Sequence, residues 1–363
     1  VTLDANATVN VAGTELRLDG VVSGAQSLSK LGAGRLVLTN SDNTYSGSTN
    51  IAAGSLVLRN DMPGTVSSGF GGAGQLVIES ASSDFAGDFN LAGAGFTFES
   101  KLGGLTIGKV SGADGATDVD VMIDNSISIA GPITVYGKDV VLGAALTVGQ
   151  HQSIVLAGSG QFINNAGSSA LNVAGTGRWV VYAGNATDNV FGGLDSQNEA
   201  IWQTSIVNLA PNEVPSGNRY VFNQAPILAV TVTTTDDTKI YGETIDLSDN
   251  YTIGVTGIAA APGVYLGTND PRTTSFDEVF DINPTFASSK ASESAIVGEA
   301  SIVSTAGIAN SGFSVTYANT GKLTVNRRPV VVTANANQQK VYGEDDPVFG
   351  YTGETQSTGP GLR

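Results

Sequence analysis

The stretch Gly34–Asn40 reads GRLVLTN, and the chain repeats it as GSLVLRN from Gly54 and as GQLVIES from Gly74. An apolar pair at positions i and i+2 is typical of a β-strand with one buried face. One such strand in each fixed period predicts a solenoid, in which every coil stacks on the previous one and aligns its leucines with those below. The two apolar positions return every 20 residues over five copies: Leu16, Leu36, Leu56, Leu76 and Phe96, and Leu18, Leu38, Leu58, Ile78 and Phe98.

Shorter apolar pairs continue this pattern beyond Phe98 at irregular spacing. No stretch has a sustained helical period, and 47 glycines with 11 prolines suit short strands joined by tight turns. We therefore expect an all-β fold in which residues 1–205 form a β-solenoid of the right-handed parallel β-helix type. A capping region near 177–202 is expected to cover its end, followed by a connector at 206–225. The continuing pairs are Leu105/Ile107, Ile127/Ile129, Ile133/Val135, Leu146/Val148, Ile154/Leu156 and Leu171/Val173.

A second repeat begins at Pro226. The segment TKIYGETIDLSDNY is echoed by QKVYGEDDPVFGY, so that Tyr241 and Tyr342 lie 101 residues apart, and a β-branched run precedes each copy. A period near 100 residues with several alternating strands predicts tandem β-sandwich-like modules. We expect a first module at 226–328 and the truncated start of a second at 329–363. Because the chain starts at Val1 and stops within this repeat, we expect it to be a fragment of a longer protein.

The composition excludes several classes of partner. A net charge of −16 with only 17 Lys plus Arg argues against nucleic acid and against an anionic membrane surface. Cysteine is absent, which excludes disulfides, cysteine-based catalysis and cysteine-ligated zinc. No apolar run reaches 18 residues, so we expect no membrane insertion by this chain. We expect a monomer.

The segment SLSKLGAGRLVLTNSDNTYSGSTNIAAGSLVL, at Ser27–Leu58, resembles the autotransporter-associated β-strand repeat of bacterial surface passengers. That family places a K-x-G-x-G-x-L-x-L strand before a polar N-x-Y-x-G turn and a G-x-L-x-L strand. The positions that match are Lys30, Gly32, Gly34, Leu36, Leu38, Asn43, Tyr45, Gly47, Gly54, Leu56 and Leu58.

The two YGE segments, with the GKLTVN ending at Gly321, resemble the MBG/YDG modules of large bacterial surface proteins. The first copy departs from the pattern, since Thr244 and Ile245 stand where the second has Asp345 and Asp346. Both resemblances imply a large exported adhesin of the filamentous-haemagglutinin-like or autotransporter-like type, located at the bacterial cell surface or secreted.

Aromatic residues are the first candidates for ligand contact. Sugars bind where an aromatic face stacks on the ring and polar side chains meet the hydroxyls. An alternative remains open, because Trp179 and Val181 alternate like buried residues and the end of a solenoid needs bulky cover. The candidate carbohydrate-binding residues are Trp179, Tyr182, Asn185, Asp188 and Trp202.

Acidic residues suggest a second kind of site, because calcium prefers several hard oxygen ligands. The segment DGATDVDVMID places the candidate ligands Asp114, Asp118, Asp120 and Asp124 close together, with a solvated outer face as the alternative interpretation. Paired carboxylates in a groove would instead suit glycosidic-bond cleavage. Calcium at a module junction is a further hypothesis for Glu344–Asp346, against a simple turn before Pro347.

His151 is the single histidine, and no GxSxG segment or other local context supports a catalytic relay, so a turn residue is expected there. The preferred function is non-enzymatic: an exported adhesin that attaches to, or aggregates through, a matrix polysaccharide or another bacterial or host cell surface. Two alternatives stay open. One is a β-helical polysaccharide lyase or hydrolase that uses paired carboxylates, and the other is a passive stalk whose binding tip lies elsewhere.

Overall fold

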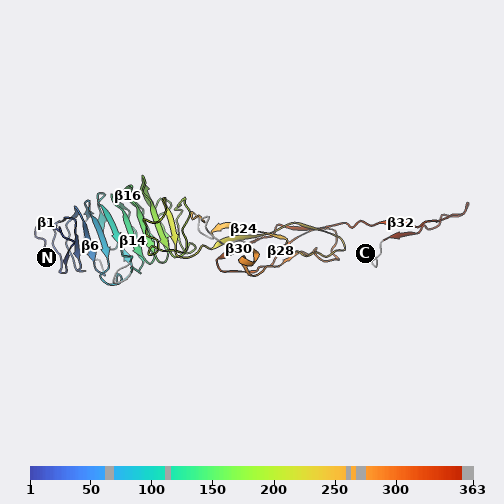
Figure 1. The fold of residues 1–363 in the computed structure, drawn as a ribbon, viewed down its shortest axis with the longest axis horizontal. Helices are drawn as coiled ribbons and strands as arrows, with labels where there is room; N and C mark the ends of the chain where they lie inside the picture. The colour runs from blue at the N-terminus through green and yellow to red at the C-terminus, as the bar shows by residue number, and fades with distance from the viewer. Residues whose placement is uncertain (62–68, 111–115, 259–262, 267–274, 354–363) are drawn as a thin grey trace. The chain divides into compact units, whose positions relative to one another are not determined.

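The computed structural model describes residues 1–61, 69–110, 116–258, 263–266 and 275–353. The chain forms two compact units: Val1–Ile227 with Ile258–Asp270, and Leu228–Gly257 with Pro271–Arg363. Within the described ranges the secondary structure is β throughout, apart from the four-residue helix α1 (Phe276–Val279), which confirms the expected all-β class (Figure 1). No described helix is long and apolar enough to span a membrane.

The first unit is built on a parallel sheet whose described strands number nine. Each strand pairs in parallel with the strand that follows it along the sheet, and we call the chain between two such strands a coil (Figure 1). This arrangement is consistent with a parallel β-helix. The strands, in sheet order, are β2 (Glu15–Leu18), β4 (Arg35–Leu38), β6 (Ser55–Arg59), β8 (Gln75–Glu79), β11 (Gly104–Ile107), β14 (Ile133–Gly137), β17 (Ile154–Gly158), β20 (Trp179–Ala183) and β21 (Arg219–Phe222).

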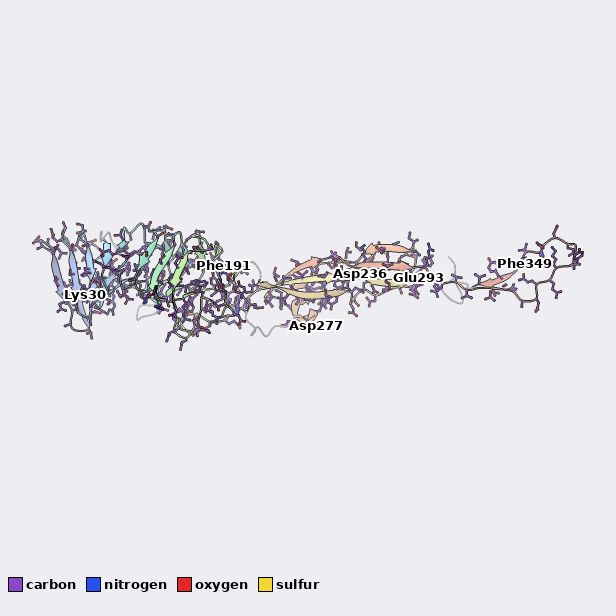
Figure 2. The ribbon with its side chains drawn as sticks, turned by 90° about the horizontal axis from the view of Figure 1, so that it is seen from above. Lys30, Phe191, Asp236, Asp277, Glu293 and Phe349 are labelled. Atoms are coloured by element: carbon purple, nitrogen blue, oxygen red, sulfur yellow. The ribbon has the colours of Figure 1, made fainter. Side chains whose placement is uncertain are left out.

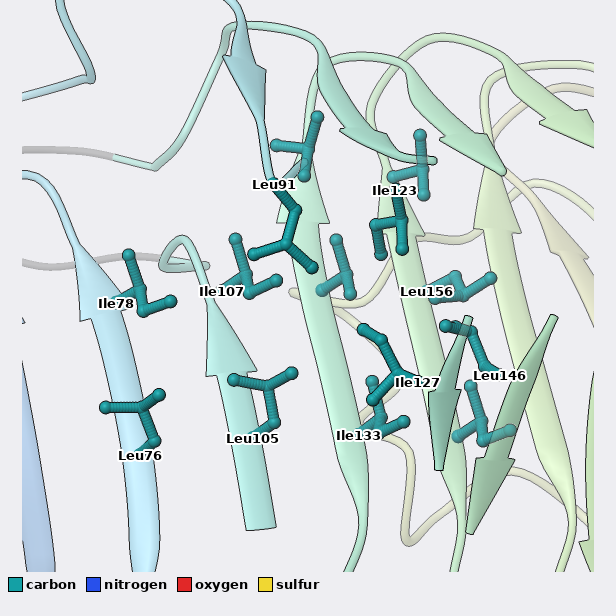
Figure 3. Packing of buried hydrophobic residues seen from close by; sticks show 14 of the residues in the cluster. Leu76, Ile78, Leu91, Leu105, Ile107, Ile123, Ile127, Ile133, Leu146 and Leu156 are labelled. Atoms are coloured by element: carbon teal, nitrogen blue, oxygen red, sulfur yellow. The ribbon is translucent and has the colours of Figure 1, made fainter. Parts of the chain in front are cut away.

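The register of this sheet confirms the leucine ladders. Leu36 pairs with Leu56, and Leu56 pairs with Leu76, so identical side chains stack from one coil to the next. All three side chains are fully buried. Figure 3 shows the rows continuing across β8, β11 and β14, with Leu76 beside Leu105 and Ile78 beside Ile107. Aligned apolar side chains therefore form the core of this unit.

The fifth copy of the 20-residue register was predicted wrongly. Phe96 and Phe98 do not extend the two ladders, which continue instead at Leu105 and Ile107. Phe98 belongs to β10 and pairs with Phe70 in a different sheet, and the Phe96 ring packs 5.7 Å from that of Phe70. The coil after Ile78 is longer than 20 residues, so the next strand of the ladder comes nine residues later than the period requires.

Smaller parallel sheets form the remaining sides of the first unit. Their inward side chains, such as Ile51, Phe70 and Ile123, join those of the nine-stranded sheet in one apolar core. The strands are β1 (Ala7–Asn10), β3 (Leu28–Leu31), β5 (Thr49–Ile51), β7 (Gly69–Gly71) and β10 (Thr97–Phe98); β18 (Phe162–Asn164), β15 (Val140–Leu142), β12 (Val121–Ile123) and β9 (Phe89–Asn90); and β13 (Ile127–Ile129), β16 (Leu146–Gln150) and β19 (Leu171–Ala174).

Part of the expected connector is sheet. Strand β21 lies within 206–225 and pairs in parallel with β20, from Val180↔Arg219 to Ala183↔Phe222. Residues Tyr220–Phe222 are fully buried. The stretch is therefore a further coil, because its apolar residues extend the core rather than face solvent. The earlier part of the expected connector, near Pro211–Pro215, has no regular secondary structure and covers the outer side of the nine-stranded sheet.

The second unit consists of short mixed sheets. In one, β22 (Leu228–Thr234) lies between β24 (Tyr251–Ile258) and β30 (Phe313–Ala318); in another, β31 (Lys322–Asn326) lies between β23 (Asp237–Ile240) and β27 (Gly298–Ser301). The pairs β22–β30 and β23–β31 are parallel, so the opening strands of the unit meet its closing strands. Three two-stranded pairs complete it: β25 (Phe280–Ile282) with β29 (Ile308–Ala309), β26 (Phe286–Ala287) with β28 (Val303–Ser304), and β32 (Val332–Ala334) with β33 (Tyr351–Gly353).

Candidate functional site

The structure contradicts a carbohydrate platform on Trp179. This side chain is only 2% exposed, so neither face of its ring can stack on a sugar. It points into the core, where its ring lies 5.0 Å from Tyr220, and the ring of Phe191 lies 4.9 Å from Tyr220 on another side. Phe191 is labelled in Figure 2. The aromatic residues near 177–202 therefore fill the interior of the last coils, in agreement with the alternative that they are structural.

Three of the other four members of the predicted sugar site, Asn185, Asp188 and Trp202, do not gather around an open face. Trp202 is half-buried and stacks on Phe222, with ring centroids 4.8 Å apart. Asn185 and Asp188 bond to each other in a local turn: the Asp188 backbone N–H donates to Asn185 Oδ1 at 2.8 Å, and Asn185 Nδ2 donates to Asp188 Oδ2 at 2.6 Å. These polar atoms stabilise a turn.

Three of the acidic candidates, Asp118, Asp120 and Asp124, flank strand β12 within a single coil. Asp114 lies outside the described residues. Asp118 is exposed, and Asp120 Oδ1 accepts the backbone N–H of Asp139 at 3.3 Å. Asp124 Oδ2 accepts a hydrogen bond from Asn90 at 2.9 Å. In the described part of the chain no three His, Cys, Asp or Glu side chains come together to hold a metal ion. Asp118, Asp120 and Asp124 therefore form no such group among the described residues, and the calcium hypothesis that also includes Asp114 stays a prediction.

His151 occupies a turn, as expected. Its backbone has a φ of 63°, in the left-handed region, and its Nδ1 accepts the Thr176 backbone N–H at 3.1 Å. The imidazole thus holds two coils together rather than acting in a relay. In the Glu344–Asp346 segment, which is exposed, Asp346 forms an ion pair with Lys340, consistent with the turn interpretation.

A cavity of about 260 Å³ lies on the outer face of the nine-stranded sheet, across β14, β17 and β20. Its floor follows one row of the register, Tyr136↔Ala157↔Tyr182. Residues Ser205–Val207 form one wall, and Val207 at the edge is 74% exposed. We call this cavity the outer-face groove; its lining includes Lys109, Tyr136, Ala157, Ser159, Tyr182 and Asn223.

The outer-face groove combines an apolar floor with polar side chains on its walls. Tyr136 is half-buried, and burial raises the pKa of its hydroxyl, so it is a neutral aromatic group at physiological pH. Tyr182 is covered more completely, and its Oη donates to the Leu209 carbonyl at 2.9 Å; burial raises its pKa too. Ser159 and Asn223 are exposed and can donate or accept hydrogen bonds. Lys109 adds a cation whose Nζ donates to the Ser82 carbonyl.

The sequence patterns do not single out Tyr136, although the pair Ile133 and Val135 predicts its strand. In Ile133–Gly137, the apolar pair Ile133 and Val135 faces the core, so strict alternation directs Tyr136 outward. Tyr182 is a predicted ligand residue and does line the groove, but the residue is only 2% exposed, so it forms part of the floor rather than an open stacking face.

Comparison with known proteins provides evidence that is independent of the structure. A family model described as "Passenger-associated-transport-repeat" matches residues 28–58, in agreement with the repeat expected at Ser27–Leu58. Over 48 residues the chain is 50% identical to the "Adhesin BmaC autotransporter" of Brucella suis biovar 1 (strain 1330), which covers 13% of this chain and 1% of that relative. No solved structure matches. The two matches support an autotransporter passenger, a class that is exported to the cell surface or secreted.

Proposed function

We propose that this chain is part of an exported adhesin that attaches to a polysaccharide of a matrix or of a bacterial or host cell surface, without enzymatic chemistry. The outer-face groove is the binding site in this proposal. The single observation that carries it is the half-buried Tyr136 beside Ala157 on a floor framed by Lys109, Ser159 and Asn223.

This combination suits a sugar ring. The apolar face of a pyranose packs against an aromatic ring, while hydroxyl and amide groups nearby satisfy its hydroxyls. A cavity of about 260 Å³ accommodates a short part of a polymer, not a long segment. Each contact is therefore weak, and many adhesins on one surface would attach through multivalency.

The second unit has a supporting role in this proposal. We propose that it is an MBG/YDG-type module with a β-sandwich-like fold, which extends the adhesin from the cell surface. The parallel pairing of its opening strands β22 and β23 with its closing strands β30 and β31 supports a self-contained module.

The test is retention of the chain on a panel of bacterial and host polysaccharides, scored together with the appearance of new polymer chain ends. We expect retention without cleavage. Tyr136→Ala should lower retention at least about tenfold, because it removes the stacking surface, whereas Tyr136→Phe should retain it. Tyr351→Ala is the matched control, since Tyr351 is 67% exposed in the other unit.

Three results would contradict this proposal. New chain ends would indicate a lyase or hydrolase. Absence of retention on every polymer would favour a passive stalk. Equal retention of the wild type and Tyr136→Ala would place any binding outside the outer-face groove.

A further inference from the structure

A row of apolar side chains lies on the outside of the sheet formed by β9, β12, β15 and β18. Met122 pairs with Val141, Val141 pairs with Ile163, and an isolated bridge joins Ile163 to Val190. In each case the residues directly before and after are buried, so alternation turns these four side chains outward. We call Met122, Val141, Ile163 and Val190 the apolar row.

The apolar row is accessible to solvent. Val190 is 47% exposed, and the other three members are half-buried. Because the four lie on successive coils, their side chains form one contiguous strip instead of scattered surface residues. A contiguous apolar strip on the outside of a folded unit is typical of a surface that binds another molecule.

Carboxylates border the apolar row on one side. Asp88, Asp120 and Asp139 stand two residues before Asn90, Met122 and Val141, and we call these three the acidic row. One oxygen of each accepts a backbone N–H of the next coil, from Asp120, Asp139 and Gln161, at 3.3, 3.3 and 2.7 Å. The second oxygen of each carboxylate can accept a hydrogen bond from a partner.

The charge around the apolar row is negative. On the side away from the acidic row, Asp124 is exposed, and its Oδ2 accepts a hydrogen bond from Asn90. No Lys or Arg stands two residues before or after any member of the apolar row. Lys138, which precedes Asp139, is exposed in the turn between β14 and β15. The strip and its border therefore favour a cationic partner.

A cavity of about 410 Å³ adjoins the same surface at Asn90, which pairs with Met122 in the sheet. Asp61 and Asp88 line it from two different coils. Its lining also contains Phe85 and Phe89, whose rings stack with centroids 5.0 Å apart. A cavity with carboxylates on its walls and aromatic carbon at its base suits a lysine or arginine side chain, which has an apolar stem and a charged end.

The spacing of the apolar row indicates the form of the partner. Neighbouring strands lie about 4.8 Å apart, and an α-helix repeats its apolar stripe about every 5.4 Å, whereas an extended chain repeats the side chains of one face about every 6.8 Å. A helix laid along the coils therefore matches the row more closely. A second copy of the chain would bring its own carboxylates against the acidic row, so repulsion disfavours self-association here.

We propose that the apolar row and the acidic row together bind an amphipathic cationic helix of another polypeptide. Its apolar side chains pack on the apolar row, its basic side chains face the acidic row, and one basic side chain near its end enters the cavity beside Asp88. The span from Asn90 to Val190 is about 19 Å, which a helix of about 13 residues covers. This surface belongs to a different sheet from the outer-face groove and does not depend on it.

A fluorescein-labelled synthetic peptide of leucine and lysine tests this, about 14 residues long with leucine at every third or fourth position. It is titrated with the full chain at physiological ionic strength, which screens long-range attraction, and followed by fluorescence anisotropy. We expect saturable binding at micromolar concentration. A peptide of the same composition with its leucines spread around the helix should bind at least about fivefold more weakly, because it presents no apolar stripe.

Two pairs of variants separate the proposed surface from net charge. Val141→Thr keeps the shape of the side chain and should weaken binding about threefold to tenfold, because it makes the centre of the apolar row polar. Its matched control is Val77→Thr, since Val77 is half-buried in β8 of the nine-stranded sheet. Asp139→Asn keeps the Oδ1 acceptor for Gln161, removes the charge and should weaken binding about threefold. Asp42→Asn removes the same charge from an exposed turn and should leave binding unchanged.

Three results would overturn the proposal. Equal losses of affinity within each pair of variants would show that binding follows net charge or overall stability. Absence of saturable binding at millimolar concentration would show that the strip takes no such helix. Self-association of the chain in sedimentation velocity, abolished by Val141→Thr, would show that a second copy covers the apolar row. Circular dichroism should be the same for all four variants, because each keeps the size of its side chain.

Discussion

Lys30 is a fully buried cation in the middle of an apolar stack. Its Nζ donates to the carbonyl oxygens of Leu31 and Gly32, at 3.0 and 2.8 Å, and to that of Ala53 in the following coil, at 3.0 Å. Burial lowers the pKa of this ammonium group. Three backbone acceptors at good distances offset the loss of hydration and tie one coil to the next.

Replacing Lys30 by Met keeps the length of the side chain and removes the donors. We expect Lys30→Met to lower the free energy of unfolding by about 2–4 kcal/mol, because buried carbonyl oxygens lose their partner. Lys101→Met is the control: Lys101 is 65% exposed at its side chain, pairs with Glu99, and should change stability by less than about 0.5 kcal/mol. Urea denaturation measures the free energy of unfolding of both variants. Equal losses of stability in the two variants would contradict a stabilising role for the buried ammonium group.

Tyr45 is fully buried in the turn of the same repeat, where its hydroxyl oxygen accepts a hydrogen bond from Thr49 Oγ1 at 3.2 Å. Burial raises its pKa from the ordinary value of about 10 to about 12. Between these values the unfolded chain releases the Tyr45 proton while the folded chain retains it. The contribution of Tyr45 to stability is therefore complete below pH 10 and is lost as the pH rises toward 12.

This loss amounts to about 2–3 kcal/mol for a shift of this size. Tyr45→Phe cannot ionise, so its unfolding free energy should fall less steeply between pH 10 and 12 than that of the wild type. Chemical denaturation at a series of pH values measures the two slopes. Parallel profiles would show that Tyr45 ionises equally in both states.

At the scale of elements, close stacking of coils depends on residues without a side chain. A Cβ added at Gly131 would lie 1.8 Å from the Gly103 carbonyl oxygen of the neighbouring coil, whereas a Cβ at Gly13 would meet nothing within 4 Å. Gly131→Ala should therefore destabilise the first unit by about 1–3 kcal/mol, and Gly13→Ala by far less. A thermal unfolding comparison decides this, and similar midpoints for the two variants would contradict it.

At the scale of the whole first unit, one side chain fixes the segment that covers the outer sheet face. Arg178 Nη1 donates to the carbonyl oxygens of Val214 and Pro215, each at 2.6 Å, and Nη2 donates to that of Pro211. Leu209 and Val214 pack in the same apolar cluster as Val180 and Tyr182. The arginine thus keeps the segment over the sheet beside the outer-face groove.

Arg178→Met should release this cover. We expect faster amide hydrogen exchange at 205–215 and at Tyr182, and weaker polysaccharide retention, because Ser205–Val207 form one wall of the groove. Arg17→Met is the control, since Arg17 pairs on the surface with Asp19. Unchanged exchange at 205–215 in Arg178→Met would show that apolar packing alone holds the segment.

The sequence by itself determined the strands and their inward faces. The pair Leu36 and Leu38 and its copies specify a period-two pattern, and a one-residue slip would turn every leucine to solvent, so the register follows from the pattern. The same reasoning identified Leu105 and Ile107, yet it also extended the period to Phe96. Spacing along the chain does not reveal how much of a coil lies in loops, so the ladder could not be followed by counting alone.

Only the tertiary structure decided which of the side chains that point away from the core are exposed to solvent. Alternation assigns Tyr136 and Tyr182 to the outer face equally, but the segment held by Arg178 covers Tyr182 and leaves Tyr136 half-buried at the groove. Likewise, the exposed positions of Asp118 and Asp124 followed from the pattern, whereas the hydrogen bond that Asp124 accepts from Asn90 of the preceding coil did not. Local periodicity determines the direction of a side chain, and distant parts of the chain determine what covers it.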